Sequence, residues 1–271
     1  MRTLAVTVAY DGTEWAGFQR QSRYPSLQAA LETALTTVLR QPTTVTGAGR
    51  TDAGVHALGQ VISLRTTSTI PVERVPWVTN RELPPSIRLR AAVEREPWFH
   101  ARLSAGYRRY VYVLQPTRRS DPLRGRFCWQ VPALDAEAMA RAATALIGRH
   151  DFAAFCHGGK ALGGSVRTLQ RLVVRQRPGL VLLDIQADAF LRRMVRLLVG
   201  TLVQVGRGVR PESWPAEVLA SRNRDLAGYG APPHGLCLMR IGYPPIGDAP
   251  PLGVYGGELT DEEFSGEIAG S

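Results

Sequence analysis

The sequence contains few cysteines, a single lysine and no long apolar run. Its three cysteines, Cys128, Cys156 and Cys237, lack the spacing of a zinc site and are too scattered to suggest a disulfide framework. No apolar run reaches the ~18 residues needed to cross a bilayer, and residues 1–9 alternate like a strand, unlike a signal peptide. We therefore expect a cytoplasmic protein without a membrane segment.

Motifs that hold metals or nucleotides are also missing. The five histidines are isolated, with neither H-x-x-x-H spacing nor ligand-spaced carboxylates, so we expect no metal site. Gly47 and Gly49 begin a dinucleotide-binding pattern, but Asp52 stands at its third glycine position, where an acid would repel a pyrophosphate. The pattern also lacks the lysine of a phosphate-binding loop. These observations predict a protein that uses no cofactor.

The charge balance is strongly basic. The chain has 33 basic and 23 acidic side chains, a net charge of +10, and Lys160 is its only lysine. Six of the acids lie in residues 247–271, which contain no base, so residues 1–246 carry a net charge of +16. A genomic preference for arginine codons accounts for the ratio of arginine to lysine, but it does not account for the net charge. The charge therefore indicates a polyanionic partner, in particular nucleic acid.

Periodic patterns predict two units of strands and helices. In the first unit, residues 4–10, 43–46 and 61–64 are expected to be strands, and Ser26 is expected to cap a helix over residues 27–38. In the second, residues 107–114 and 181–187 alternate like strands, Asp135 is expected to cap a helix that ends at Gly148, and residues 191–203 have helical spacing. We predict an α+β protein with antiparallel sheets, divided into residues 1–105, 106–246 and an acidic, disordered tail at 247–271.

The segment 47–60 contains one acidic residue, Asp52, together with four glycines, and Arg50 stands two positions before it. Because the segment lies between two expected strands, Asp52 belongs to a loop, and loops on rigid strands commonly carry chemistry. An ionised aspartate beside an arginine can act as a nucleophile or a base. An aspartate beside glycine also commonly caps a turn. The pattern alone leaves both interpretations open.

Two further segments combine arginines with aromatic or apolar residues. Residues 107–112 (YRRYVY) form a strand that either stacks bases and contacts phosphates, or packs its tyrosines inward and exposes its arginines. In residues 190–200 the apolar side chains form a helical stripe, and Arg192, Arg193 and Arg196 lie off it. These three arginines are expected either to face solvent or to point at a cleft.

A series of motifs follows in one order along the chain: residues 10–13 (YDGT), 17–21 (GFQRQ), 49–57 (GRTDAGVHA), 99–102 (FHAR), 109–110 (RY), 151–152 (DF), 194–200 (MVRLLVG) and 211–214 (PESW). In this order they closely resemble the TruA family of tRNA pseudouridine synthases. The motif GRTDAGVHA is highly specific, and the resemblance covers residues 4–243.

The resemblance implies roles for individual residues. Asp52 would be the catalytic carboxylate and Arg196 the cation paired with it. Tyr110 would stack on the target base and remove the proton from its C5 atom. Further contacts with the RNA are expected from Arg50, His56 and Arg109.

The same resemblance implies a fold and a reaction. Each subunit of a homodimer would have two ferredoxin-like (RRM-like) halves that form a continuous antiparallel sheet flanked by helices. The enzyme would convert uridine to pseudouridine at positions 38–40, in the anticodon stem-loop of tRNA. The bond from ribose C1′ to uracil N1 breaks and C1′ joins C5, so the reaction needs no cofactor. Asp52 would attack C1′, attack C6 or remove a ribose proton, and the sequence does not distinguish among these.

Two other classes of function are considered beside this one. A non-catalytic RNA-binding protein would keep the fold and the basic surface, and replacement of Asp52 would favour it. An RNA glycosidase pairs two carboxylates, and a nuclease needs a metal cluster or paired histidines. The segment around Asp52 supplies one carboxylate.

Overall fold

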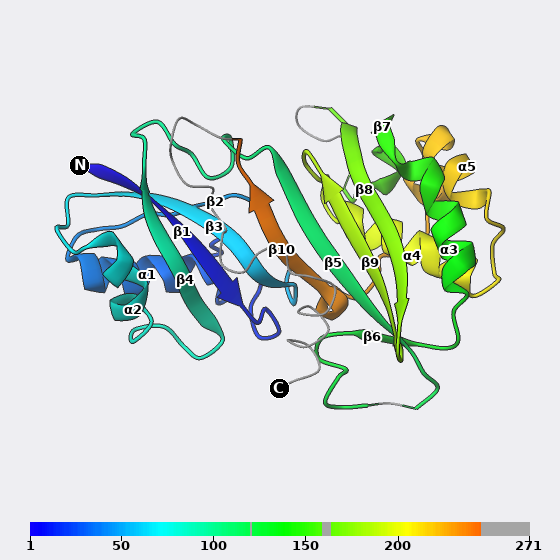
Figure 1. Cartoon of the computed structure of the whole chain (residues 1–271), viewed down its shortest axis with the longest axis horizontal. Helices are drawn as coiled ribbons and strands as arrows, with labels where there is room; N and C mark the ends of the chain where they lie inside the picture. Colours follow the sequence, from blue (N-terminus) through cyan, green and yellow to red (C-terminus); the bar gives the residue numbers. More distant parts are fainter. Residues whose placement is uncertain (120, 159–163, 245–271) are drawn as a thin grey trace.

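The computed structural model describes residues 1–119, 121–158 and 164–244, and its strands form one continuous sheet (Figure 1). The strand order is β4-β1-β3-β10-β5-β9-β8-β7, with β2 beside β3 and β6 beside β5. The strands are β1 (Arg2–Tyr10), β2 (Thr46–Gly47), β3 (His56–Thr66), β4 (Ile87–Arg95), β5 (Tyr107–Pro116), β6 (Trp129–Val131), β7 (Gly148–Asp151), β8 (Val166–Arg177), β9 (Leu180–Ala187) and β10 (Leu236–Gly242). The α-helices are α1 (Leu27–Leu39), α2 (Val75–Thr79), α3 (Ala136–Ala143), α4 (Met194–Gly206) and α5 (Trp214–Ser221).

The sheet is mixed, which corrects the expectation of a wholly antiparallel sheet. Two of its strand pairs, β3 with β10 and β5 with β6, are parallel, and the other pairs are antiparallel. β10 pairs with β3 over two residue pairs, Cys237 with His56 and Leu238 with Ala57. The direction of β10 is set by its longer antiparallel pairing with β5. β3 therefore meets a neighbour whose direction is already fixed, and the junction between the two sides of the sheet is parallel.

Apart from β6, β7 and α5, which are additional elements of the second side, both sides of this junction follow the same connection pattern of strand, helix, two strands, helix and strand. The orders β4-β1-β3-β2 and β10-β5-β9-β8 each place the fourth strand of the pattern beside the first. This is the ferredoxin-like arrangement, so the predicted α+β class and the continuous sheet with flanking helices are confirmed. The boundary between residues 105 and 106 stays a prediction. The tail at 247–271, expected to be disordered, lies outside the described residues.

The helices lie on one face of the sheet (Figure 1), and one large core fills the space between helices and strands. β5 shows how the two faces differ. Tyr110, Tyr112 and Leu114 belong to the large core, as their alternation predicts. Val111 and Val113 belong to a small cluster on the opposite face, because successive side chains of a strand alternate. Tyr110 and Tyr112 therefore point toward the helices.

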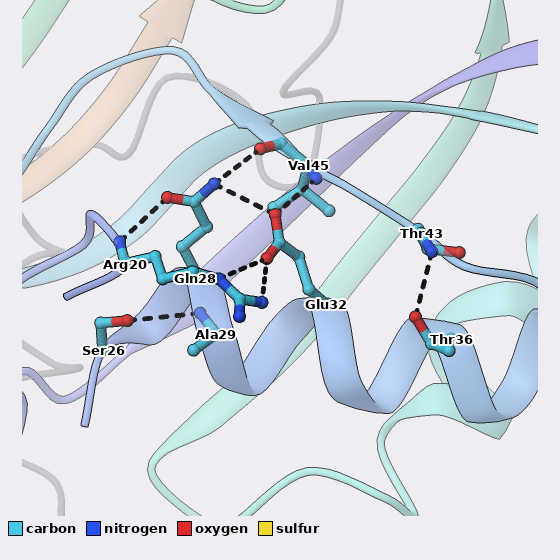
Figure 2. Close-up of polar contacts among 8 residues, drawn as sticks. All are labelled: Arg20, Ser26, Gln28, Ala29, Glu32, Thr36, Thr43 and Val45. Carbon is cyan, nitrogen blue, oxygen red and sulfur yellow. Dashed lines mark hydrogen bonds and ion pairs between the residues drawn. The ribbon is translucent and has the colours of Figure 1, made fainter. Parts of the chain in front are cut away.

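Helix α1 begins where the sequence predicts, and it explains why the strand after it is short. Ser26 caps the helix by accepting a hydrogen bond from the backbone nitrogen of Ala29 at 3.4 Å. The strand expected over residues 43–46 is observed only as β2. The backbone nitrogens of Thr43 and Val45 donate instead to side chains of α1, to Thr36 Oγ1 at 3.1 Å and Glu32 Oε1 at 3.0 Å (Figure 2).

Two helices of the second unit differ from the prediction at their ends. Asp135 caps α3 as expected, at 2.9 Å from the backbone nitrogen of Ala138. However, α3 ends at Ala143, a 3₁₀ turn follows at Thr144–Leu146, and Gly148 begins β7. α4 begins at Met194 rather than at residue 191. Within the described ranges, no helix has both the length and the apolar character that crossing a bilayer requires.

The carboxylate of Glu32 joins α1 to its surroundings, and its removal should destabilise the protein. Glu32 is buried and also accepts from Gln28 Nε2 at 3.1 Å and from Arg20 Nε at 3.0 Å (Figure 2). Because Glu32→Ala leaves the buried backbone nitrogen of Val45 without its acceptor, we expect the free energy of unfolding to fall by about 2 kcal/mol in urea denaturation. Thr33→Ala, at an exposed position of the same helix, should change it by less than about 0.5 kcal/mol. Equal effects of the two substitutions would contradict this account.

Candidate active site

The loop that carries Asp52 spans residues 48–55 between β2 and β3, where the sequence places it. β3 begins at His56, earlier than the predicted residue 61, so strands hold both ends of a short loop. The fully buried side chain of Gln60, on β3, forms hydrogen bonds with this loop. Its side-chain nitrogen donates to the Gly49 carbonyl at 2.7 Å, and its side-chain oxygen accepts from the Gly49 nitrogen at 3.3 Å. The side chain of Gln60 thus satisfies the backbone at the start of the loop.

The other side of the loop rests against the end of β1 and the segment that follows it. The hydroxyl groups of Thr51 and Tyr10 are 2.8 Å apart, and the backbone nitrogen of Phe18 donates to the Thr51 carbonyl at 3.1 Å. Gly17 has a φ of 98°, and a Cβ at this position would lie 2.8 Å from the same carbonyl oxygen. Only glycine allows both this conformation and this close approach. The loop is therefore fixed on two sides.

The carboxylate of Asp52 forms an ion pair with Arg196, which lies in the first turn of α4. Arg196 Nη1 is 3.0 Å from Asp52 Oδ2, and Arg196 Nε donates to the Ala231 carbonyl at 2.6 Å. The Arg196 side chain is 13% exposed and that of Asp52 is 32% exposed. A second guanidinium, from Arg193, has its Nε 4.0 Å from the same Oδ2. A largely buried cation thus orients a carboxylate that solvent can reach.

Tyr110 lies beside this pair, on the face of β5 that points toward the helices. Its side chain is buried, and its ring packs edge-on against Phe190, with the ring centroids 5.3 Å apart. Its hydroxyl lies 3.8 Å from where a Cβ of Gly49 would stand, which places it next to the Asp52 loop. Burial raises the pKa of Tyr110 well above its usual value, and nearby Arg108 lowers that pKa only in part. The phenol is therefore neutral at physiological pH.

The other predicted site residues are placed differently. Arg50 is exposed on the loop itself. His56 is buried, with Nδ1 3.1 Å from Asp11 Oδ1 and Nε2 3.2 Å from the His234 carbonyl, and burial lowers its pKa. Arg109 lies on the face of β5 opposite Tyr110 and makes a two-pronged ion pair with Asp184, at 2.8 and 2.9 Å. The structure thus brings Asp52, Tyr110 and Arg196 together, and it engages His56 and Arg109 in other contacts.

Three contributors to the site were not assigned a role from the sequence: Gln60, Phe190 and Arg193. Phe190 and Arg193 belong to the arginine-rich segment at residues 190–200, so that segment held the signal. Gln60 ends the glycine-rich segment, but no sequence pattern shows that a side chain bonds back to its own loop. Within the ranges that the structure describes, no group of three or more His, Cys, Asp or Glu side chains is arranged to hold a metal ion.

Comparison with known proteins identifies the class. A sequence model of the family described as tRNA pseudouridine synthase matches residues 6–103 and 142–244. A tRNA pseudouridine synthase A of Moorella thermoacetica is 44% identical over 247 residues, which is 90% of this chain and 100% of that protein. The enzyme of the same name in Myxococcus xanthus is 42% identical over 268 residues, 98% of this chain and 100% of that protein.

These matches define an RNA-modifying isomerase that acts on tRNA. The chain belongs to the tRNA pseudouridine synthase family, in the TruA group.

The contact between Gln60 and Gly49 should be needed for catalysis as well as for stability. Gln60→Leu keeps the volume of the side chain but removes both hydrogen bonds to the loop. We expect the free energy of unfolding to fall by about 2 kcal/mol, and the rate of pseudouridine formation to fall about a hundredfold because the carboxylate is misplaced. The exposed Gln176 on β8 provides the control, and Gln176→Leu should keep the wild-type rate. A wild-type rate in Gln60→Leu would show that the loop positions Asp52 without this contact.

Proposed function

We propose that the protein converts uridine to pseudouridine at positions 38–40, in the anticodon stem-loop of tRNA, with Asp52 as the catalytic carboxylate. The observation that carries this proposal is the ion pair between Asp52 and Arg196 beside the buried Tyr110. Both guanidinium contacts go to Oδ2 of Asp52, and no hydrogen bond to Oδ1 is found in the described part of the chain. Oδ1 is therefore the oxygen placed to act on a substrate.

The reaction is an isomerisation that moves one bond and exchanges one proton. The bond from C1′ to N1 breaks, the base turns, C1′ joins C5, C5 loses its proton and N1 takes one up. The site supplies one carboxylate for this step, whether Asp52 attacks C1′, attacks C6 or removes a ribose proton. The target uridine must leave its stack, which costs a few kcal/mol. The ring of Tyr110 is buried against Phe190 in this structure, so it must be uncovered before it can stack on the base and offset part of that cost.

The neutral state of Tyr110 bears on its proposed role in removing the C5 proton. A phenol whose pKa is raised by burial holds its proton at physiological pH. Its hydroxyl must therefore pass its own proton to solvent when it accepts the one from C5, while N1 takes up a proton in exchange. We propose that Tyr110 relays this proton. Its ring then provides the stacking surface, and its oxygen provides the path for the proton.

Other parts of the proposal rest on the family and on exposure. The enzyme is proposed to act as a homodimer in the cytoplasm, with the exposed Arg50 in contact with the RNA. The engaged side chains of His56 and Arg109 are better suited to supporting the sheet than to binding RNA. A non-catalytic RNA-binding protein of the same fold is the alternative.

Replacement of Asp52 distinguishes the two functions. We expect Asp52→Ala and Asp52→Asn to lower pseudouridine formation on unmodified tRNA by at least about a thousandfold, while tRNA binding is retained or becomes tighter because a negative charge is lost. Chemical mapping of pseudouridine in purified reactions measures the rate and the modified position. The control Glu137→Gln, at an exposed site on α3, should keep full activity. Turnover by the Asp52 variants would exclude the carboxylate as the catalyst.

Tyr110→Phe separates stacking from proton transfer. The variant keeps the ring and loses the hydroxyl, so we expect tRNA binding to change by less than about twofold and single-turnover modification to slow by about a hundredfold. Because the phenol is neutral in the wild type, the modification rate of the wild-type enzyme should not rise tenfold per pH unit between pH 7 and 9. Such a rise would show that the phenolate is the active form. Equal rates for the two proteins would rule out a role for the hydroxyl.

A further inference from the structure

The start of α4 carries more positive charge than Asp52 neutralises. Arg196 pairs with Asp52, and Arg193 lies at the outer limit of an ion pair with the same oxygen. The side chain of Arg192 reaches Gly158: a Cβ on Gly158 would lie 3.3 Å from Arg192 Nη1. The first turn of α4 contains no acidic residue. Positive charge at a helix N-terminus is unfavourable because the helix dipole is positive there.

His157 lies close to these arginines, and their positive charge lowers its pKa. The backbone nitrogen of His157 donates to the Arg192 carbonyl at 3.0 Å. The pKa of His157 is lowered, mainly by Arg193, with smaller effects from partial desolvation, Arg192 and Arg224, and Asp52 opposes them only weakly. The cluster of Arg192, Arg193, Arg196 and Arg224 thus creates a positive potential that one carboxylate does not cancel. Such a potential favours the binding of an anion.

Arg193 has the backbone conformation that marks it within this cluster. It precedes α4 with φ 59° and ψ 12°, in the left-handed region that residues other than glycine and asparagine rarely adopt. Its guanidinium lies beside Asp52, and its side chain is 38% exposed. Residues in unfavourable backbone conformations concentrate at functional sites. The cost is therefore consistent with a task for the Arg193 side chain.

We infer that Arg193 binds one of the two backbone phosphates that flank the target nucleotide. This inference rests on the proposed function, because it requires the ribose or base of that nucleotide to react at Asp52. Arg196 is held between Asp52 and the Ala231 carbonyl, whereas Arg193 is 4.0 Å from the carboxylate and open to solvent. A nucleotide that reacts at Asp52 brings its own flanking phosphates near this guanidinium. The planar fork of arginine matches the oxygens of a phosphate.

The test combines a protein substitution with a substitution in the RNA. Arg193→Asn removes the guanidinium and keeps a residue that tolerates the left-handed conformation. The substrates are unmodified tRNA and two versions that carry one neutral methylphosphonate, either 5′ or 3′ of the target uridine. We expect Arg193→Asn to lower kcat/KM on natural tRNA about tenfold, and one methylphosphonate to lower it similarly for the wild type. The two changes together should cost no more than either alone.

Arg40 provides a matched control, because it is also an exposed arginine in the left-handed region, with φ 54°, at the end of α1. Arg40→Asn should leave kcat/KM and its response to both methylphosphonates unchanged. Arg193→Lys should recover part of the lost activity by restoring charge. If the loss of kcat/KM from Arg193→Asn multiplies with the loss from the methylphosphonate at both the 5′ and the 3′ position, the inference is overturned, even if Arg193→Asn is slow on natural tRNA. A wild type that forms no pseudouridine in natural tRNA would instead refute the proposed function.

Discussion

The site depends on one ion pair that joins distant parts of the chain. Asp52 and Arg196 are 144 positions apart, one on a loop before β3 and the other on α4. The segment that leads into β10 holds Arg196 in position beside Asp52. Ala231 and Arg196 exchange hydrogen bonds, at 2.6 Å from the side chain and 2.9 Å from the backbone. Nearby, Tyr112 donates to the Pro232 carbonyl at 2.8 Å. The geometry of the carboxylate is therefore a property of how the two sides of the sheet meet.

Signals that depend on neighbours in sequence predicted most of the elements. The caps at Ser26 and Asp135 and the inward positions of Tyr110 and Tyr112 follow from rules that act over a few residues. The short β2 did not follow from such rules, because Thr36 and Glu32 of α1 take the backbone donors of the preceding residues. The parallel junction of β3 and β10 also depends on pairing between distant segments. Periodicity within a strand contains no information about the direction of its neighbour.

The same distinction applies to the site. The glycine-rich segment placed Asp52 on a loop, and the structure agrees. Arg50, two positions before Asp52, is exposed, and the pairing cation comes from α4. Residue patterns left the role of the arginines in 190–200 open. Only the family resemblance predicted that Arg196 and Tyr110 act together with Asp52. The supporting bond from Gln60 to Gly49 had no counterpart in sequence, because it joins a strand interior to a loop through a side chain.

The position of β10 also has a consequence in time. It comes last among the described strands, yet it lies in the middle of the sheet, between β3 and β5 (Figure 1). A chain that grows from its N-terminus on the ribosome can pair β1 with β3 and β4 early, but β3 and β5 stay apart until residues 236–242 have emerged. Arg196 and Ala231 are both synthesised before β10, but Ala231 lies on the segment that leads into β10, and β10 fixes this segment when it pairs with β3 and β5. The site around Asp52 therefore takes its final form late in synthesis, when the central strand joins the two sides of the sheet.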